Sequence, residues 1–315
     1  MHAKISSYQL GHILAFLKKD YLLYGHKAED RQAVFAQIDS AGELAIPAPK
    51  TIMPFKKILF ENNRTPKKDN RKIAFLALPP CDAWALEIFL KQFKKVDLLP
   101  ERKNLFVMTT ECEPDEHCFC NAFGFKEPKF FDLHLEKSGS GFTVFTGSEK
   151  GESLLKMVGI KPSVKPSKPK EIPNKKAQIS PEELAEEVGN KALHLDFWQK
   201  IANNCFACGA CTAVCPLCFC TRQEFNNLPA GESKKSGCEN CLSWDACFSK
   251  SFFEIQHHHD LEPKNVDHLY NWYHHKFVRA VSETGESLCT GCGRCIEACP
   301  ANLNQEGIMR AVTKE

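Results

Sequence analysis

Eight of the seventeen cysteines in this 315-residue chain fall into two copies of the spacing C-x2-C-x2-C-x3-C-P, at residues 205–216 and 289–300. In two-cluster ferredoxins with this spacing, three cysteines of each motif bind one [4Fe–4S] cluster and the fourth binds the other cluster. The spacing therefore predicts one-electron transfer chemistry. The expected ligands are Cys205, Cys208, Cys211 and Cys299 for the first cluster, and Cys289, Cys292, Cys295 and Cys215 for the second.

The same spacing also argues against zinc. Thiolates two residues apart wrap a tight loop around one corner of a cubane, and Gly209, Gly291 and Gly293 allow the backbone to approach it closely. Tandem zinc sites are the alternative, because C-x2-C pairs also occur in zinc ribbons. Zinc takes its four ligands as two pairs, so a third cysteine at the same spacing favours iron–sulfur clusters. No separate mononuclear metal site is expected.

Four further cysteines lie within residues 1–160, and they predict a third site. Two of them follow expected strands, and loops at the carboxyl edge of an open α/β sheet converge on a shared crevice. We expect a [4Fe–4S] cluster there, with zinc or buried structural thiols as alternatives. The expected ligands are Cys81, Cys112, Cys118 and Cys120.

The remaining five cysteines predict a fourth site of open nuclearity. The triplet C-F-C occurs at 118–120 and again at 218–220, and five residues separate Cys112 from Cys118 just as they separate Cys241 from Cys247. The expected ligands are Cys218, Cys220, Cys241 and Cys247, with Cys238 as an alternative to Cys241.

Composition excludes several classes of protein. Disulfides dominate small secreted domains, and this long chain has an odd number of closely spaced cysteines, so metal-bound thiolates in a cytoplasmic protein are expected. The net charge of +2 and the lack of a basic helix disfavour a nucleic-acid partner. No apolar run approaches the roughly 18 residues of a membrane span, so no membrane insertion is expected. The histidines at 257–259 and 274–275 are interpreted as a polar run or partner surface, with metal ligation or proton transfer as alternatives.

The elements that position these cysteines predict an α+β protein. Residues 1–160 read as an α/β domain that begins with an amphipathic helix in residues 1–26. Residues 71–93 predict a buried strand, a Pro-Pro turn carrying Cys81 and a helix from Asp82, and residues 104–114 predict a second strand. A hairpin is expected over 130–147, followed by a short helix at 148–158 with Ser148 as its cap.

A Lys/Pro-rich linker at 161–180 is expected to join this domain to a second domain. Residues 181–315 predict an α-helical, ferredoxin-like domain with two [4Fe–4S] clusters, which opens on a Ser-Pro-Glu-Glu helix start. A cysteine-rich insertion at 221–288 separates its two motifs and carries little strand signal.

Taken together, these motifs resemble the anaerobic sulfite reductase family of iron–sulfur electron-transfer subunits, to which the sulfhydrogenase (cytosolic NiFe hydrogenase) beta subunits belong. The resemblance runs from about residue 50 to 310. It rests on PPCD (79–82), ECEPDEHCFCNAFG (111–124), CFACGACTAVCPLCFC (205–220), WDAC (244–247), HHKF (274–277) and CTGCGRCIEACP (289–300). The family pattern supports Cys218, Cys220 and Cys247 as ligands, whereas Cys238 and Cys241 are additions in this chain.

The resemblance implies an iron–sulfur electron-transfer subunit of a cytoplasmic redox complex, with no catalysis of its own. Its implied partners are a flavin-containing, NAD(P)H-oxidising protein and a catalytic partner such as a sulfite reductase, a NiFe hydrogenase or a heterodisulfide-reductase-like protein. Lys276 and Arg294 are candidates for raising a cluster potential. One alternative is a catalytic subunit that reduces sulfite or a disulfide at a non-standard cluster. Another is a redox-sensing or structural cluster protein.

Overall fold

The backbone of the computed structural model forms two compact units. The first contains Met1–Phe55, Asn70–Gln178 and Thr290–Cys292, and the second contains Lys56–Asp69, Ile179–Cys289 and Gly293–Glu315. In this division, most of the expected linker groups with the first unit. The structure describes residues 2–29, 32–61, 72–92, 100–163, 167–173, 176–190, 194–225, 240–249, 252–255, 259–260 and 264–314.

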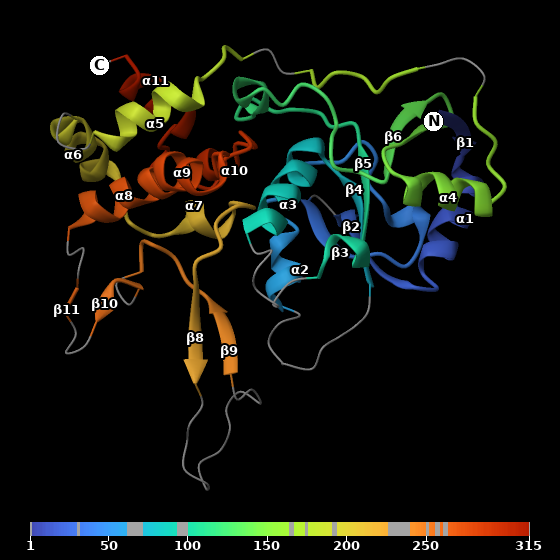
Figure 1. Ribbon diagram of the computed structural model, residues 1–315, viewed down its shortest axis with the longest axis horizontal. Helices are drawn as coiled ribbons and strands as arrows, with labels where there is room; N and C mark the ends of the chain where they lie inside the picture. Colours follow the sequence, from blue (N-terminus) through green and yellow to red (C-terminus); the bar gives the residue numbers. More distant parts are fainter. Residues whose placement is uncertain are drawn as a thin grey trace, which may run out of the picture. The chain divides into compact units, whose positions relative to one another are not determined.

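The first unit is a mixed α/β fold around a seven-stranded sheet with the order β1-β7-β6-β5-β4-β2-β3 (Figure 1). The strands are β1 (His2–Ser6), β2 (Tyr21–Glu29), β3 (Gln32–Gln37), β4 (Lys72–Leu78), β5 (Leu105–Thr110), β6 (Leu133–Ser138) and β7 (Gly141–Thr146). The four central strands run parallel, while β1, β7 and β3 add antiparallel edges. Strands β4 and β5 are apolar along almost their whole length because helices cover both of their faces.

The expected first helix is shorter than the sequence indicated. Residues 2–6 instead form β1, which pairs with β7. The alternation of apolar residues in this edge strand runs directly into the helical spacing of α1 (Ser7–Leu17), and the two patterns cannot be separated locally. The second difference concerns Cys81, which lies in the first turn of α3 (Pro80–Gln92) and not in a loop before it.

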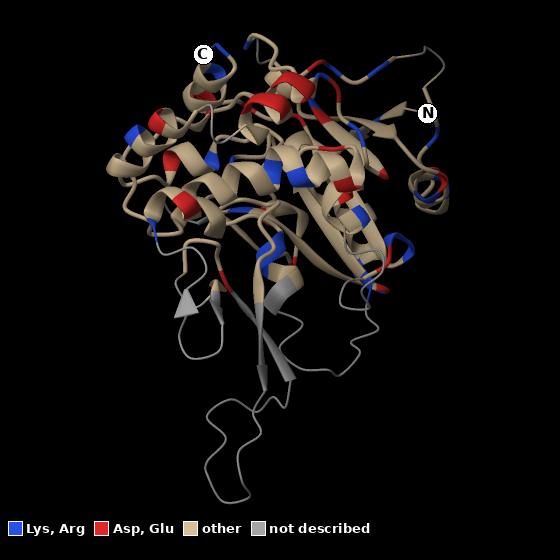
Figure 2. Cartoon of the chain, turned by 60° about the vertical axis from the view of Figure 1, so that its left-hand side comes forward, with Lys and Arg blue, Asp and Glu red and all other residues tan. Residues whose placement is uncertain are grey.

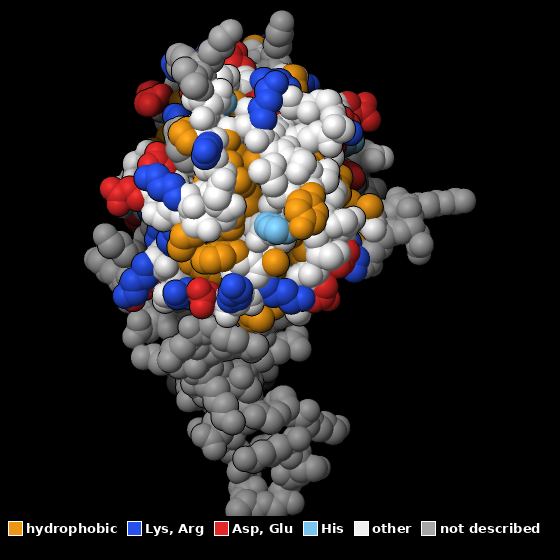
Figure 3. Space-filling model, turned by 90° about the vertical axis from the view of Figure 1, so that its right-hand side faces the viewer, with side chains coloured by type: hydrophobic (Ala, Val, Ile, Leu, Met, Phe, Trp, Pro, Cys, Tyr) orange, Lys and Arg blue, Asp and Glu red, His pale blue; other side chains and the backbone are white. Residues whose placement is uncertain are grey.

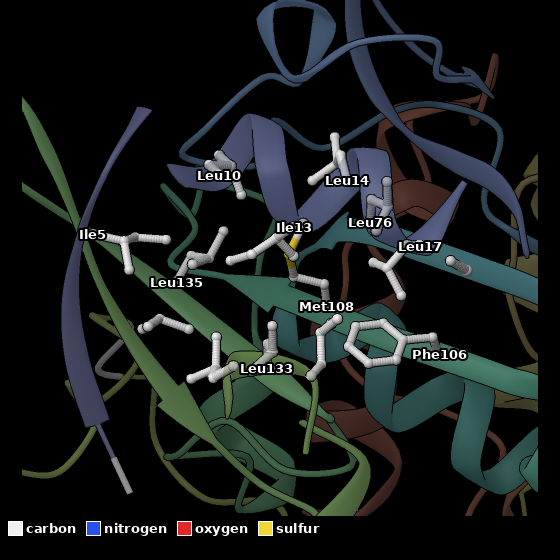
Figure 4. Close-up of a cluster of buried hydrophobic side chains, with 14 of the residues drawn as sticks. Ile5, Leu10, Ile13, Leu14, Leu17, Leu76, Phe106, Met108, Leu133 and Leu135 are labelled. Carbon is white, nitrogen blue, oxygen red and sulfur yellow. The ribbon is translucent and has the colours of Figure 1, made fainter. Parts of the chain in front are cut away.

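A single apolar core joins α1 and α4 (Glu149–Met157) to one face of the sheet. Figure 4 shows Leu10, Ile13 and Leu17 of α1 pointing at Met108 and Leu133 of the sheet, and all five are at most 3% exposed. Helix α3 covers the opposite face, which is why the sheet holds its carboxyl-edge loops in fixed positions (Figure 1). Single-turn helices at Ala41–Glu43, Arg102–Asn104 and Cys120–Phe123 complete the unit.

Replacing Ser148 with alanine is expected to lower the free energy of unfolding of this unit by about 1–2 kcal/mol. The Ser148 hydroxyl accepts a hydrogen bond from Gly151 N at 3.2 Å and donates one to Asp132 Oδ1 at 2.5 Å, so alanine removes both the helix cap and a bond to a buried carboxylate. Urea denaturation measures the loss. Ser153→Ala, an exposed serine in the same helix, is the control and should change stability little.

The second unit is mainly helical. Its helices are α2 (Lys56–Glu61), α5 (Pro181–Gly189), α6 (Leu195–Asn204), α7 (Ala210–Ala213), α8 (Asn265–His274), α9 (Ala280–Thr284), α10 (Arg294–Glu297) and α11 (Gln305–Val312), with a π-helical turn at His275–Arg279 between α8 and α9. Ser180 caps α5 by accepting from Glu183 N, as the Ser-Pro-Glu-Glu start predicts. The chain then turns at Asn190 and begins α6 separately.

The expectation of little strand in the 221–288 insertion is wrong at two places. Strands β8 (Thr221–Phe225) and β9 (Asn240–Trp244) form an antiparallel pair, as do β10 (Glu254–Ile255) and β11 (His259–Asp260). These strands are short and mixed in polarity, so they lack the alternation by which a half-buried strand is recognised. Backbone pairing with a neighbouring strand defines them.

The surface gives no sign of a membrane span: in the described residues, no helix is both long and apolar enough to cross one. Basic and acidic side chains are distributed over the described elements of both units (Figure 2). On the face seen in Figure 3, hydrophobic side chains lie between polar ones. The large hydrophobic side chains that are exposed in the first unit include Tyr8 and Met157.

Candidate iron–sulfur centres

A cavity in the second unit gathers the four cysteines expected to bind the first cluster. Cys205, Cys208, Cys211 and Cys299 all line it. The other lining side chains are largely apolar and include Trp272. A group held by four thiolates and otherwise surrounded by hydrocarbon is what a [4Fe–4S] cluster requires, so these residues fit the group.

The two motifs use the same backbone device to present their cysteines. Gly209 and Gly293 each follow the second cysteine of a motif, and their φ angles are +73° and +74°. This left-handed conformation, which glycine adopts without strain, turns the chain into α7 in one motif and α10 in the other. The two short helices pack against each other.

Backbone groups also point at the cysteine sulfurs of the first site. Ala207 N donates to Cys205 Sγ and Leu303 N donates to Cys299 Sγ, both at 3.4 Å. Asn265, at the start of α8, donates from Nδ2 to Cys205 O at 2.8 Å and so holds the loop in place. Burial raises the pKa of Cys211 to about 12, so a thiolate forms there at neutral pH only with a positive partner such as iron.

The cysteines expected at the second site lie around the end of α8. Cys215 and Cys289 both face the Lys276 ammonium, and Lys276 Nζ donates to Cys215 Sγ at 3.2 Å and to Leu288 O at 3.0 Å. Burial lowers the pKa of Lys276, but the Cys215 and Cys218 sulfurs raise it further, and the net shift is upward. Cys295 lies near the buried Tyr273 hydroxyl. Cys292, the remaining expected ligand, belongs to the short segment Thr290–Cys292 of the first unit.

The four N-terminal cysteines gather at the carboxyl edge of the sheet, in the first unit. Cys120 is buried in a small apolar cluster against which Cys81 and Cys112 pack. Cys118 lies next to them, with Sγ 3.3 Å from Asp115 Oδ1. Burial raises the pKa of Cys112 and Cys118 to about 12 and that of Cys120 to about 11. These thiols therefore also need a cation to ionise at neutral pH, which fits a metal-bound group.

Segment Thr290–Cys292 packs directly against this N-terminal group. Phe119 N donates to Gly291 O at 2.8 Å, and Cys118 Sγ lies 3.8 Å from Cys292 O. The Cys292 sulfur is close enough to Cys120 to raise the pKa of Cys120. An expected ligand of the second cluster thus lies beside an expected ligand of the third.

Comparison with known proteins agrees with these positions. A family model described as a 4Fe-4S dicluster domain matches residues 204–303. Sulfhydrogenase 2 subunit beta of Pyrococcus furiosus is 28% identical over 319 residues, a match that covers 94% of this chain and 93% of that protein. The chain is a relative of the sulfhydrogenase beta subunits. The resemblance inferred from the cysteine motifs is therefore confirmed for the sulfhydrogenase branch.

This sulfhydrogenase beta-subunit relative also brings together three of the cysteines expected at a fourth site. The Cys247 thiol donates a hydrogen bond to Cys220, which lowers the pKa of Cys220 to about 7 and raises that of Cys247. Cys218 adds to the pKa rise of Cys247 through its charge. His268 of α8 bonds Cys247 O at 2.7 Å through Nδ1. Cys241 lies in β9 opposite Glu224, and Cys238 lies outside the described residues.

Cys215 also belongs to this fourth group by position. The Cys218 thiol donates a hydrogen bond to the Cys215 sulfur, which lowers the pKa of Cys215 and raises that of Cys218. The turn that runs from Cys215 to Cys220, hereafter the Cys215–Cys220 turn, is therefore where expected ligands of two sites meet. In the described residues, no three His, Cys, Asp or Glu side chains converge to hold a single metal ion.

Other residues singled out in the sequence have plain positions. Arg294 is completely buried at the start of α10. Burial lowers the pKa of His275 to about 4, so His275 is neutral near pH 7 and does not exchange protons there. His257 and His258 lie outside the described residues.

Lys56 is the functional candidate that sequence reasoning missed in this sulfhydrogenase beta-subunit relative. It begins α2, it has no exposed surface, and its Nζ donates to Thr212 O and to Cys218 O, both at 2.8 Å. These partners are 156 and 162 residues away in the chain. No local pattern marks such a lysine, because only the packing of α2 into the second unit gives it its role.

Proposed function

We propose that the chain is an iron–sulfur electron-transfer subunit of a cytoplasmic oxidoreductase complex. It relays electrons between a flavin-containing, NAD(P)H-oxidising partner and a catalytic partner of the hydrogenase type. The observation that carries the proposal is the cavity in which Cys205, Cys208 and Cys211 of one motif meet Cys299 of the other. The whole-length similarity to a sulfhydrogenase subunit supports the hydrogenase-type partner.

The C-terminal part of the chain is proposed to be a ferredoxin-like, mainly helical domain for two [4Fe–4S] clusters. When bound, such clusters accept and release one electron at a time. The residues of this chain hold them, exclude water and supply hydrogen bonds to the sulfurs. The proposed sets are Cys205, Cys208, Cys211 and Cys299 for the first cluster, and Cys289, Cys292, Cys295 and Cys215 for the second.

A third cluster is proposed at Cys81, Cys112, Cys118 and Cys120, because these buried thiols gather at one edge of the sheet. A fourth is proposed at Cys218, Cys220 and Cys247, with Cys241 or Cys238 completing the set. Among the described cysteines only Cys208 has an exposed side chain. The first site is therefore the proposed point of exchange with a partner.

Anaerobic reconstitution tests the relay. About eight irons per chain correspond to the ferredoxin pair, and about sixteen correspond to all four sites. We expect more than eight, together with EPR signals that a reduced flavoprotein induces and an oxidised viologen removes, with no other substrate present. Clusters that hold the fold but exchange no electrons with either reagent would instead indicate a structural or sensing role.

A second candidate function rests on a cavity beside the N-terminal cysteines. Glu111, Cys112, His134 and Lys170 line it, so polar groups surround one expected cluster ligand. His134 Nδ1 bonds Thr109 Oγ1 at 2.9 Å and Lys170 Nζ donates to Glu111 Oε2 at 3.1 Å, which fixes these groups in place. A catalytic subunit would bind sulfite or a disulfide there. A change in the EPR spectrum of the isolated, reduced chain on adding either compound would support this function over the relay.

A further inference from the structure

Two lysine ammonium groups are buried at the Cys215–Cys220 turn. Lys56 has no exposed surface and Lys276 is 3% exposed. They come from α2 and from the π-helical turn after α8, so separate elements bring them to the same turn. Lysine is rarely buried completely, and a buried ammonium needs hydrogen bonds and a negative partner to offset the loss of water.

The hydrogen bonds of the two lysines converge on the same stretch of chain. Lys56 donates to the carbonyl oxygens of Thr212 and Cys218, and Lys276 donates to the Cys215 sulfur. The Lys276 ammonium also lies 5.1 Å from the centre of the Trp272 ring, a favourable cation–π position. Both ammonium groups are thus held in place at the cysteines, with little freedom to turn away.

The electrostatic neighbours of Lys56 are sulfurs. Cys218, Cys215 and Cys220 all stabilise its charge, whereas Lys276 opposes it. Two like charges held this close in a protein interior repel each other, and neutral thiols cannot compensate that repulsion. Thiolates that bind an iron–sulfur cluster are anionic as a set, and they would compensate both charges.

We propose that Lys56 and Lys276 are positioning residues whose two buried positive charges raise the reduction potential of the clusters bound at the Cys215–Cys220 turn. Reduction adds one electron, and so one negative charge, to a group that faces both ammonium ions, while no proton need move. Net charge and hydrogen bonds to the sulfurs are established determinants of cluster potential. The turn would then collect electrons from the first site, whose other cysteines Lys56 does not face.

The inference rests on the proposed electron-relay function, and potentiometric EPR on the reconstituted full chain separates the two. Lys56→Met is expected to keep the wild-type iron content and to lower the midpoint potential of at least one cluster. The equilibrium constant for its reduction should fall about tenfold, which is about 59 mV for a one-electron couple. Lys276→Met should lower the potential of the same signal. Lys57→Met, an exposed lysine one residue further along α2, is the matched control and should leave all potentials unchanged.

Midpoint potentials in iron-replete Lys56→Met that equal those of Lys57→Met would overturn the inference, although the relay would stand. If Lys56→Met loses iron, Lys56→Gln decides the matter, since glutamine keeps a hydrogen-bond donor without the charge. Lys56→Gln with full iron and a lowered potential supports the inference, and with a wild-type potential it overturns it. Failure to bind iron while Lys56→Arg binds it also supports the charge. Failure of both variants contradicts a role for the charge. A wild-type chain whose clusters exchange no electrons would overturn the relay itself.

Discussion

Replacing Cys112 with alanine is expected to remove about four irons and four sulfides per reconstituted chain. The reason is geometric: Cys112 packs with Cys81 against the buried Cys120, and Cys118 lies beside them. A cluster that loses one of four thiolates from such a closed site has no neighbouring cysteine to replace it, since Cys292 is the expected ligand of another cluster. Iron and acid-labile sulfide analysis measures the loss, and EPR shows which signal disappears.

The control for this variant is Glu113→Ala, an exposed position in the same loop that should keep the full iron content. If Cys112→Ala also kept the full iron content, the four thiols would be packing residues and the third cluster would not exist. The pKa of about 12 at Cys112 already indicates a neutral thiol in the absence of metal, because burial penalises the thiolate. The iron count therefore distinguishes a metal ligand from an ordinary buried cysteine.

Gly291→Ala is expected to have the largest effect on stability of any single substitution considered, more than about 4 kcal/mol. Gly291 has φ +65°, and a Cβ there would lie 2.6 Å from Phe119 C and O and 2.7 Å from Cys120 N. All three are backbone atoms, which cannot rotate away as a side chain could. The methyl group would push apart the segments that carry Cys120 and Cys292, so we also expect lower occupancy of the second and third clusters.

Gly285→Ala is a close control for this prediction. Gly285 also has a left-handed backbone, with φ +77°, but nothing lies within 4 Å of its added Cβ. Its substitution should cost only the conformational penalty of about 1–2 kcal/mol. Denaturant unfolding of both reconstituted variants, with iron analysis, separates strain from collision. Equal destabilisation of the two variants would contradict the close approach of Gly291 to the Phe119–Cys120 backbone.

Several parts of the fold were predictable because their signals are local. Strands β4 and β5 are apolar runs bounded by turn residues, and the β6–β7 hairpin combines alternation with a Ser/Gly turn. The cap of α4 by Ser148 follows from the residue types at the helix start. Strand β1 was missed because its partner β7 is about 140 residues away, and its own five residues merge with the helical pattern that follows.

By itself, the sequence determined the iron–sulfur chemistry, since three thiolates two residues apart form a cluster-binding loop from local geometry alone. The match of residues 204–303 to a 4Fe-4S dicluster domain agrees with that spacing. Tertiary structure decided what surrounds the loops: Cys299 joins Cys205 in one cavity, Gly291 meets the Phe119–Cys120 backbone, and Lys56 reaches Cys218. These contacts depend on how distant elements pack, and neither residue type nor spacing encodes them. The charges that surround a cluster therefore had to be read from the fold.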